Sequence, residues 1–176
     1  MKKLNLQTLR KQIRTYKDWP KKGINFLDIT KLLYNRVMFR KAIRLMVDSL
    51  LEKRVEVVLC PESRGFIFGA AVAMLLSAGV LVARKSGKLP PCPKKKVSYN
   101  LEYGKDALEI PSGFIRKGTR VAIVDDVLAT GGTAKALEGA VTKMGGVVVS
   151  NVFLIEIKDC QGRGKLESLV YSILDF

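Results

Sequence analysis

The sequence predicts an α/β domain with a central, mostly parallel sheet flanked by helices. Short apolar, β-branched runs alternate with helix-like segments along the chain, as in repeated strand–helix–strand units. With 176 residues and 48% hydrophobic residues, the chain is long enough for one sizeable core and short for two. The expected strands are 55–59, 80–83, 121–124 and 147–157, and a last apolar stretch at 168–174 predicts an edge strand.

Apolar residues at helical spacing predict two helices in the first third of the chain. The clearer one covers residues 39–50 and leads directly into the first core strand. A shorter amphipathic helix is expected over residues 6–16. The N-terminal pattern lacks the basic, apolar and small-residue regions of a signal peptide.

The segment 65–83 carries no charge and is close to the length that spans a bilayer. Ser77–Gly79 has the composition of a helix terminus, however, and the apolar residues after it predict a short strand. We therefore expect a helix packed on the sheet and then the next strand, with no membrane span.

The region 86–111 is rich in Gly, Pro, Lys and Tyr and has little periodicity. We expect a large loop or excursion from the domain here, with the lysine triplet at 94–96 in a solvated loop. Unstructured segments of this length inside a compact domain are usually functional.

The chain is strongly basic, with 31 Lys and Arg against 16 Asp and Glu and a formal net charge of +15. Such a balance predicts an anionic partner or substrate. Zinc-ligand spacing, basic-zipper heptads and a basic stripe interleaved with aromatics are all missing from the sequence, so nucleic acid is not expected. Three widely spaced cysteines without a CxxC pair indicate neither a zinc site nor a disulfide scaffold and favour a reducing cytoplasm.

The most informative stretch is VAIVDDVLATGGT, residues 121–133. Its first four residues predict a strand buried on both faces. Asp125 and Asp126 then emerge at the carboxyl end of this strand, where open α/β sheets bind their ligands. Because adjacent carboxylates repel each other, we expect a ligand that donates hydrogen bonds or carries positive charge. Ribose hydroxyls and Mg²⁺ both qualify.

A Gly-rich turn at the start of a helix follows, formed by Ala129, Thr130, Gly131, Gly132 and Thr133. Glycines let the backbone aim its N–H groups at a ligand, and the threonine hydroxyls add donors. Unpaired amides and the helix dipole there favour a phosphate dianion. The turn lacks the Lys of a Walker loop and the three spaced glycines of a dinucleotide fingerprint. A ligand-free capped turn would explain a bare Asp-Asp pair, but the complete pattern predicts a ribose-phosphate site.

This stretch resembles the motif with which type I phosphoribosyltransferases bind 5-phosphoribosyl 1-diphosphate (PRPP). The resemblance implies the type I phosphoribosyltransferase fold, with an N-terminal hood at about 1–33 and a core at about 34–176 of one domain. It also implies transfer of ribose 5-phosphate from PRPP to a nitrogen nucleophile, with Mg²⁺ and release of pyrophosphate.

Four further blocks occur in the order found in the adenine-specific members of that family: Trp19–Thr30, Glu62–Phe66, Arg84–Pro90 and Tyr99–Gly104. Five colinear blocks are far more specific than any one of them. They imply an enzyme of purine salvage that converts adenine and PRPP to AMP and pyrophosphate.

The resemblance implies a pyrophosphate loop made of Glu62, Ser63, Arg64 and Gly65, with Arg64 also close to the base. Arg84 and Lys88 match basic ligands of the diphosphate. The chemistry agrees, because Arg gives bidentate contacts and Lys a point charge to a highly anionic substrate. Taken alone, the turn at 62–65 would favour a helix-capping role, and Arg84 and Lys88 would favour a solvated strand end.

Glu102 and Tyr103 match a loop that closes over the active site in the family. The whole chain contains no histidine, so the commonest general base is absent. Glu102 is therefore our candidate for the proton at the purine nitrogen that attacks C1 of the ribose, and Tyr103 for shielding or orienting the diphosphate. An exposed loop glutamate without a catalytic role is the alternative.

The base site of the family resembles residues 23–30, where Phe26 would stack on the ring and the backbone around Asn25 would read its exocyclic group. Val127 would cover the opposite face. The chain departs from the pattern at Leu27, where many members have Arg, at Asn25, where an apolar residue is usual, and at Glu62, where others have Asp. Hypoxanthine, guanine and xanthine therefore stay open as alternative bases.

The expected cofactor is Mg²⁺, held mainly by PRPP with Asp125 and Asp126 as candidate ligands. By resemblance we also expect a homodimer with small-molecule substrates. A hypothesis from another class is a non-catalytic regulator that senses PRPP and binds nucleic acid through its basic surface.

Overall fold

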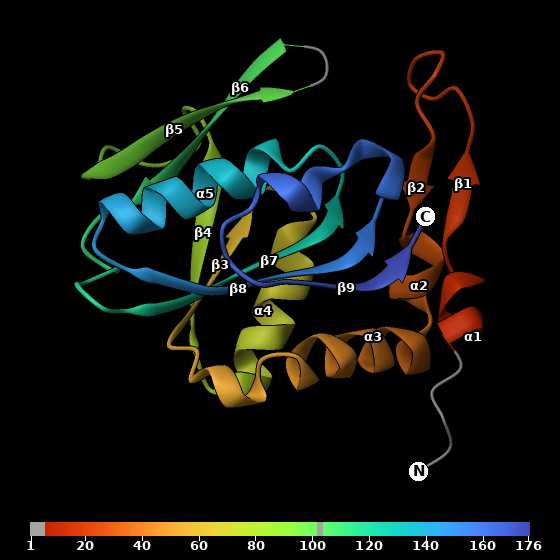
Figure 1. The fold of residues 1–176 in the computed structure, drawn as a ribbon, viewed down its shortest axis with the longest axis horizontal. Helices are drawn as coiled ribbons and strands as arrows, with labels where there is room; N and C mark the ends of the chain where they lie inside the picture. The colour runs from red at the N-terminus through yellow and green to blue at the C-terminus, as the bar shows by residue number, and fades with distance from the viewer. Residues whose placement is uncertain (1–5, 102–103) are drawn as a thin grey trace. The chain divides into compact units, whose positions relative to one another are not determined.

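A seven-stranded sheet in the order β5-β6-β4-β3-β7-β8-β9 is the frame of residues 46–176 (Figure 1). The computed structural model describes residues 6–101 and 104–176. Strands β4, β3, β7, β8 and β9 run parallel, and β6 and β5 continue the sheet antiparallel. The bounds are β3 Val57–Pro61, β4 Gly79–Lys85, β5 Lys94–Leu101, β6 Gly104–Pro111, β7 Arg120–Leu128, β8 Val147–Glu156 and β9 Val170–Asp175. The predicted α/β fold class and the predicted edge strand are confirmed.

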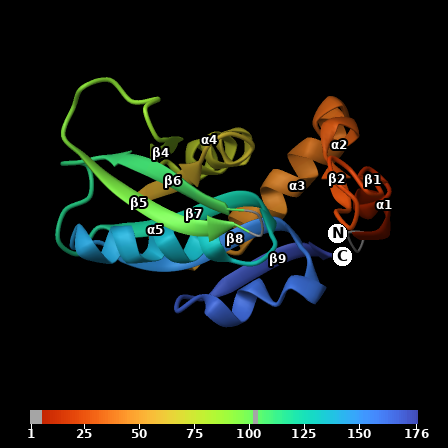
Figure 2. The same cartoon turned by 90° about the horizontal axis from the view of Figure 1, so that it is seen from above.

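Helices α4 (Gly65–Leu76) and α5 (Gly132–Lys143) lie on opposite faces of this sheet (Figure 2). The connection from β3 through α4 leads to β4 on one side, whereas β7 through α5 leads to β8 on the other. Right-handed crossovers in opposite directions place their helices on opposite faces. The neighbouring strands β3 and β7 are therefore the topological switch point, where the loops diverge and leave a crevice for ligands.

Strand β7 shows why the sequence forms a buried central strand. Residues 121–124 have no exposed surface, and Val121 and Ile123 pack with Leu59, Leu137 and Val141 in the core between the sheet and α5. The strand continues to Leu128, four residues beyond the predicted end. Asp125 and Asp126 therefore lie within the last part of the strand rather than after it. No side chain of 121–124 faces solvent, which is why this run reads as continuously apolar.

The unit that runs from Met1 to Leu45 has a two-stranded antiparallel sheet of β1 (Arg14–Tyr16) and β2 (Phe26–Asp28). Its helices are α1 (Leu6–Arg10) and α2 (Thr30–Tyr34), and α3 (Arg36–Asp48) continues past its end. The predicted helix over 6–16 is wrong in its second half, because 14–16 pairs with 26–28. The β-branched residues Ile13 and Thr15 favour extended backbone there.

The region 86–111 is mostly a hairpin, which corrects the prediction of a large loop. Strands β5 and β6 pair along their whole length, from Lys94 opposite Pro111 to Leu101 opposite Gly104. Leu108 and Ile110 are buried on one face of β6. Lys95 of β5 pairs with the buried Ile110 and so takes a position where alternation would place an apolar residue. The triplet at 94–96 therefore belongs to β5. Lys94 Nζ lies 3.0 Å from a carboxylate oxygen of Glu109, which is almost fully buried.

Helix α4 accounts for the uncharged run at 65–83, as expected. It ends at Leu76, and Ser77 takes a left-handed conformation before β4 begins at Gly79. None of the helices in the described part of the chain is long and apolar enough to cross a membrane. The connection from β8 to β9 contains two short 3₁₀ helices, Lys158–Cys160 and Gly162–Lys165, and a third, Leu51–Lys53, follows α3.

Candidate functional site

The predicted site residues of the core gather at the switch point between β3 and β7. Two cavities adjoin there, one of about 110 Å³ at the start of α5 and one of about 370 Å³ between the ends of β3, β4 and β7. Asp125, Val127 and Ala129 line both of them. A ligand with an anionic group at each end and a sugar between them would fit this arrangement.

Asp125 and Asp126 differ in surroundings although they are adjacent. Burial raises the pKa of Asp125 well above its ordinary range, and the neighbouring charge of Asp126 raises it further. Burial also raises the pKa of Asp126, and the Arg64 guanidinium opposes this shift. Arg64 Nε lies 2.8 Å from Asp126 Oδ2, so the buried carboxylate of Asp126 is held in an ion pair.

Gly65, the first residue of α4, lets Asp125 lie against this helix. A Cβ at Gly65 would be 2.8 Å from Asp125 Oδ1 and 2.9 Å from Pro61 Cδ. The same Asp125 oxygen accepts a hydrogen bond from the Asp126 amide at 2.8 Å. Gly65 is thus needed for close approach, which the sequence prediction of a role in a pyrophosphate loop did not include.

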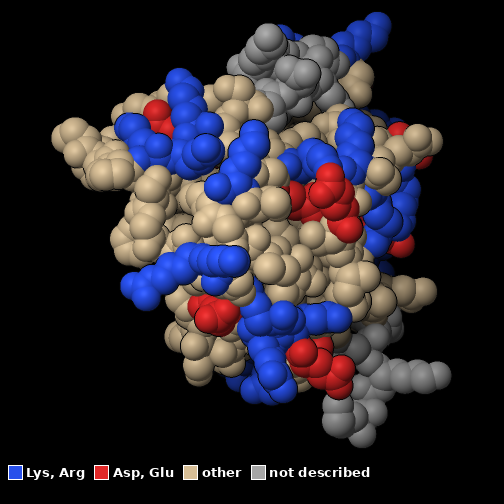
Figure 3. Space-filling model, turned by 60° about the vertical axis from the view of Figure 1, so that its left-hand side comes forward, with Lys and Arg blue, Asp and Glu red and all other residues tan. Residues whose placement is uncertain are grey.

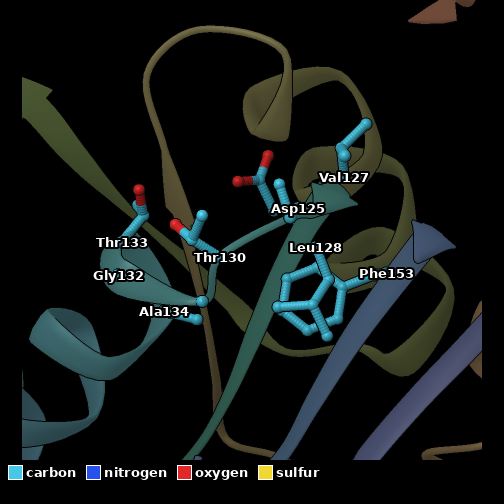
Figure 4. Close-up of a pocket in the computed structure, with 10 residues that line it drawn as sticks. Asp125, Val127, Leu128, Thr130, Gly132, Thr133, Ala134 and Phe153 are labelled. Carbon is cyan, nitrogen blue, oxygen red and sulfur yellow. The ribbon is translucent and has the colours of Figure 1, made fainter. Parts of the chain in front are cut away.

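The Gly-rich turn has the geometry expected of a phosphate site. Gly131 adopts φ +77° as the N-cap of α5, and it has no side chain with which to cap that helix. The smaller cavity lies directly above it and is lined by all five residues of the predicted turn. In Figure 4 the hydroxyls of Thr130 and Thr133 and the Asp125 carboxylate face the same space. Uncapped amides at a helix N-terminus bind phosphate well.

Phe153 and Leu128 form the floor of this cavity (Figure 4). Both are almost fully buried and pack together with Ala134 in a small cluster beneath the turn. Sequence analysis missed both residues, because each looks like an ordinary core residue of a strand. The register that places Phe153 opposite Asp125 could not be read from the sequence.

The larger cavity is lined by Glu62, Ser63 and Arg64 from the β3–α4 turn together with Asp126. Glu62 is bound by two groups of β4: the Arg84 guanidinium donates to it at 2.9 Å, and so does the Lys85 amide at 2.9 Å. The hydrogen bond from Arg84, then that from the Lys85 amide, lowers the pKa of Glu62, and the charge of Lys88 adds a little. The peptide bond between Glu62 and Ser63 is cis.

The turn after β4 carries Lys88, which is exposed. Glu109 of β6 holds this turn, since its carboxylate accepts hydrogen bonds from the Ser86 hydroxyl at 3.1 Å and the Gly87 amide at 3.2 Å. The sequence did not single out Glu109. Lys85, which lines the larger cavity, was also missed. The predicted roles of Arg84 and Lys88 toward a diphosphate stay predictions.

Asn25 and Phe26 belong to the first unit. Phe26 lines an apolar cavity of about 200 Å³ with Tyr16, Trp19 and Asp28. The rings of Trp19 and Phe26 pack edge to face, with 4.6 Å between their centroids. Leu27 points to the other side of β2 and is buried. Asn25 is exposed. Glu102 and Tyr103 lie outside the described residues, so their predicted roles stay predictions.

Comparison with known proteins agrees with this geometry. A family profile described as phosphoribosyl transferase domain matches residues 28–171. An adenine phosphoribosyltransferase of Clostridium perfringens is 46% identical over 170 residues, which cover 96% of this chain and 98% of the relative. The chain belongs to the adenine phosphoribosyltransferase family.

Solved structures of this family share the fold. The adenine phosphoribosyltransferase of Thermoanaerobacter pseudethanolicus has a TM-score of 0.93 and 41% identity, with 97% of this chain and 99% of that chain covered. The Saccharomyces cerevisiae protein, solved with an imino-altritol bisphosphate and adenine, has a TM-score of 0.89 and 34% identity, with 96% and 98% covered. The type I phosphoribosyltransferase fold predicted from the sequence is therefore confirmed.

Proposed function

We propose that this protein transfers ribose 5-phosphate from PRPP to adenine and releases pyrophosphate. The observation that carries the proposal is the pair of adjoining cavities that share Asp125, Val127 and Ala129. One cavity lies at the N-terminus of α5 and suits the 5-phosphate, and the other is lined by Arg64 and Lys85, which suit the diphosphate. The family relationship supports adenine as the acceptor.

In this reaction the bond from C1 of the ribose to the diphosphate oxygen breaks, and pyrophosphate leaves with the electron pair. A bond forms from the adenine imidazole nitrogen to C1, and that nitrogen loses its proton. Positive charge develops on the ribose as pyrophosphate departs, so preorganised carboxylates and exclusion of water favour the transition state. In this proposal, Asp125 and Asp126 accept hydrogen bonds from the ribose hydroxyls.

Mg²⁺ fits the site as an ion bound chiefly to substrate oxygens. Asp125 and Asp126 are hard oxygen ligands, and two carboxylates suit a cation that keeps water and phosphate oxygens in its shell. Within residues 6–101 and 104–176, no group of three acidic, His or Cys side chains could form a metal cage. When bound, Mg²⁺ would neutralise charge on the leaving pyrophosphate.

Glu102 receives the adenine proton and Tyr103 orients the diphosphate in this proposal. The support is the Leu-Glu-Tyr-Gly block at 101–104 and the lack of histidine in the whole sequence. By resemblance to the family, Phe26 is proposed to stack on the base. Leu27 is buried away from the cavity beside Phe26, so the departure from Arg there need not change contacts with the base.

We also propose that the protein works as a homodimer in a reducing compartment such as the cytoplasm. Its three cysteines are all free, which suits that compartment. Sedimentation equilibrium tests the dimer, and a stable monomer at working concentration would overturn it.

The rival regulator would need a basic surface suited to nucleic acid. Figure 3 shows Lys and Arg side chains in several separate groups on the face drawn, with acidic side chains among them. Scattered charge of this kind gives little specific recognition. A mobility-shift assay at physiological salt should show no retardation of DNA or RNA.

The direct test offers PRPP and Mg²⁺ with adenine, hypoxanthine, guanine or xanthine in separate reactions. We expect AMP from adenine and little product from the others. Product from another base alone would keep the mechanism and change the acceptor. Binding of PRPP without turnover of any base would instead favour the regulator.

A further inference from the structure

The connection between β8 and β9, residues 158–169, passes directly behind the phosphate turn, and we call it the strap. Gly162 of the strap is buried against Ala129–Gly131. A Cβ at Gly162 would overlap the Ala129 carbonyl oxygen and lie 2.7 Å from the Gly131 nitrogen. A Cβ at Gly131 would likewise lie 2.5 Å from the Gly162 carbonyl oxygen. The two backbones are therefore in direct contact, and only glycine fits on either side.

Arg163, the next residue, fixes the strap to the end of the sheet. Its guanidinium donates to both carboxylate oxygens of Glu156, at 3.0 Å and 2.5 Å, and to the Val170 carbonyl at 2.6 Å. Glu156 ends β8 and is almost fully buried, and Val170 begins β9. A bidentate pair of this kind holds one geometry, because the planar guanidinium fork matches the carboxylate. Arg163 thus fixes the position of Gly162.

The far end of the strap is tied to α5, the helix that begins at the phosphate turn. Glu138 of α5 is almost fully buried, and its carboxylate accepts the amides of Glu167 and Ser168, both at 3.0 Å. Asn151 of β8 donates to the same carboxylate at 2.8 Å. The strap is therefore anchored on both sides of the turn, to the sheet by Arg163 and to the helix by Glu138.

Gly131 and Gly132 give the phosphate turn conformational freedom, and Gly131, the N-cap of α5, has no side chain with which to cap the helix. Backbone amides bind a phosphate tightly only when they are held in position before the ligand arrives. Contact with Gly162 supplies that restraint from the side opposite the cavity.

We propose that the strap positions the phosphate turn, with Gly162 in contact with the turn and Arg163 as the positioning residue that holds Gly162 in place. This inference rests on the proposed function, since it assigns the turn to the 5-phosphate. It predicts that disturbing the strap weakens binding of ligands with that phosphate and leaves adenine binding unchanged.

The test compares Gly162→Ala with Gly164→Ala, a matched control in the same 3₁₀ helix. Gly164 is exposed, and a Cβ there meets nothing within 4 Å. Calorimetric titration with AMP, PRPP and adenine should show Gly162→Ala binding AMP and PRPP roughly 10- to 100-fold more weakly, the loss expected when one or two charge-assisted hydrogen bonds are misaligned. Gly164→Ala should bind all three ligands like the unaltered protein. Equal AMP affinity in the two variants would overturn the inference.

Variants of Arg163 distinguish an effect on the position of the phosphate turn from a general loss of folding stability. Arg163→Met should raise the KM for PRPP more than it lowers kcat, and Arg163→Lys should restore part of the affinity because it keeps one charged donor to Glu156. All kinetics are run well below each variant's Tm. A fall in kcat alone, or a loss of adenine affinity equal to the loss of AMP affinity, would contradict a positioning role. If the unaltered protein binds neither AMP nor PRPP, the proposed function fails, which is a different result.

Discussion

Replacing Gly65 with alanine tests how closely Asp125 packs against α4. The new Cβ would lie 2.8 Å from Asp125 Oδ1, about 0.6 Å inside the 3.4 Å at which ordinary contacts begin, so one of the two groups must move by that much. A rigid Pro61 ring 2.9 Å away blocks the other direction. Overpacking of this kind costs about 1–3 kcal/mol of unfolding free energy.

Gly139→Ala is the matched control, because Gly139 lies in the exposed middle of α5 and a Cβ there meets nothing within 4 Å. It should stabilise the protein by about 0.5–1 kcal/mol through helix propensity. The difference between the two variants isolates the clash. Thermal unfolding followed by circular dichroism should place the Tm of Gly65→Ala roughly 2–12 °C below that of Gly139→Ala.

Gly65→Ala should also bind PRPP about tenfold more weakly, a loss of roughly 1.4 kcal/mol, because the displaced Asp125 no longer meets the ribose. Equal Tm values for the two variants, together with unchanged PRPP affinity, would refute this packing of the site.

Two further predictions concern acid stability and the proton acceptor. Hydrogen bonds from Arg163 lower the pKa of Glu156 from 4.5 to about 2, so the stability that this pair adds is present above pH 4.5 and is lost as pH falls through about 2. Urea unfolding should therefore show the gap between the unaltered protein and Arg163→Met closing over that range; a gap independent of pH would exclude this linkage. Glu102→Gln should lower single-turnover rates by about 100-fold or more with PRPP affinity retained, as for loss of a general base. An unchanged rate would remove Glu102 from the mechanism.

The parts of the fold that the sequence predicted well are those where local and long-range requirements agree. Residues 121–124 are apolar on both faces because helices cover both faces of β7. Gly131 could be assigned to a turn because its left-handed backbone strongly favours glycine. Signals of this kind survive in a single sequence.

The parts that were missed depend on partners distant in the chain. Lysines on β5 hide a strand whose identity comes from pairing with β6. Glu109 looks like a surface charge until the fold buries it, and Arg163 does so until the fold buries its partner Glu156. Gly162 gives a weak signal, a Gly-Arg-Gly run before the last strand, but its contact with Ala129–Gly131 arises only from the path of the strap.

If the two cavities at the switch point hold the two anionic ends of PRPP, a crystal structure with bound AMP and pyrophosphate will show one anion in each cavity. We expect the 5-phosphate within hydrogen-bond distance of the backbone amides of residues 130–133, the ribose hydroxyls on Asp125 and Asp126, and pyrophosphate beside Ser63 and Arg64. A phosphate bound instead between Arg84 and Lys88, with the turn at α5 empty, would contradict this placement.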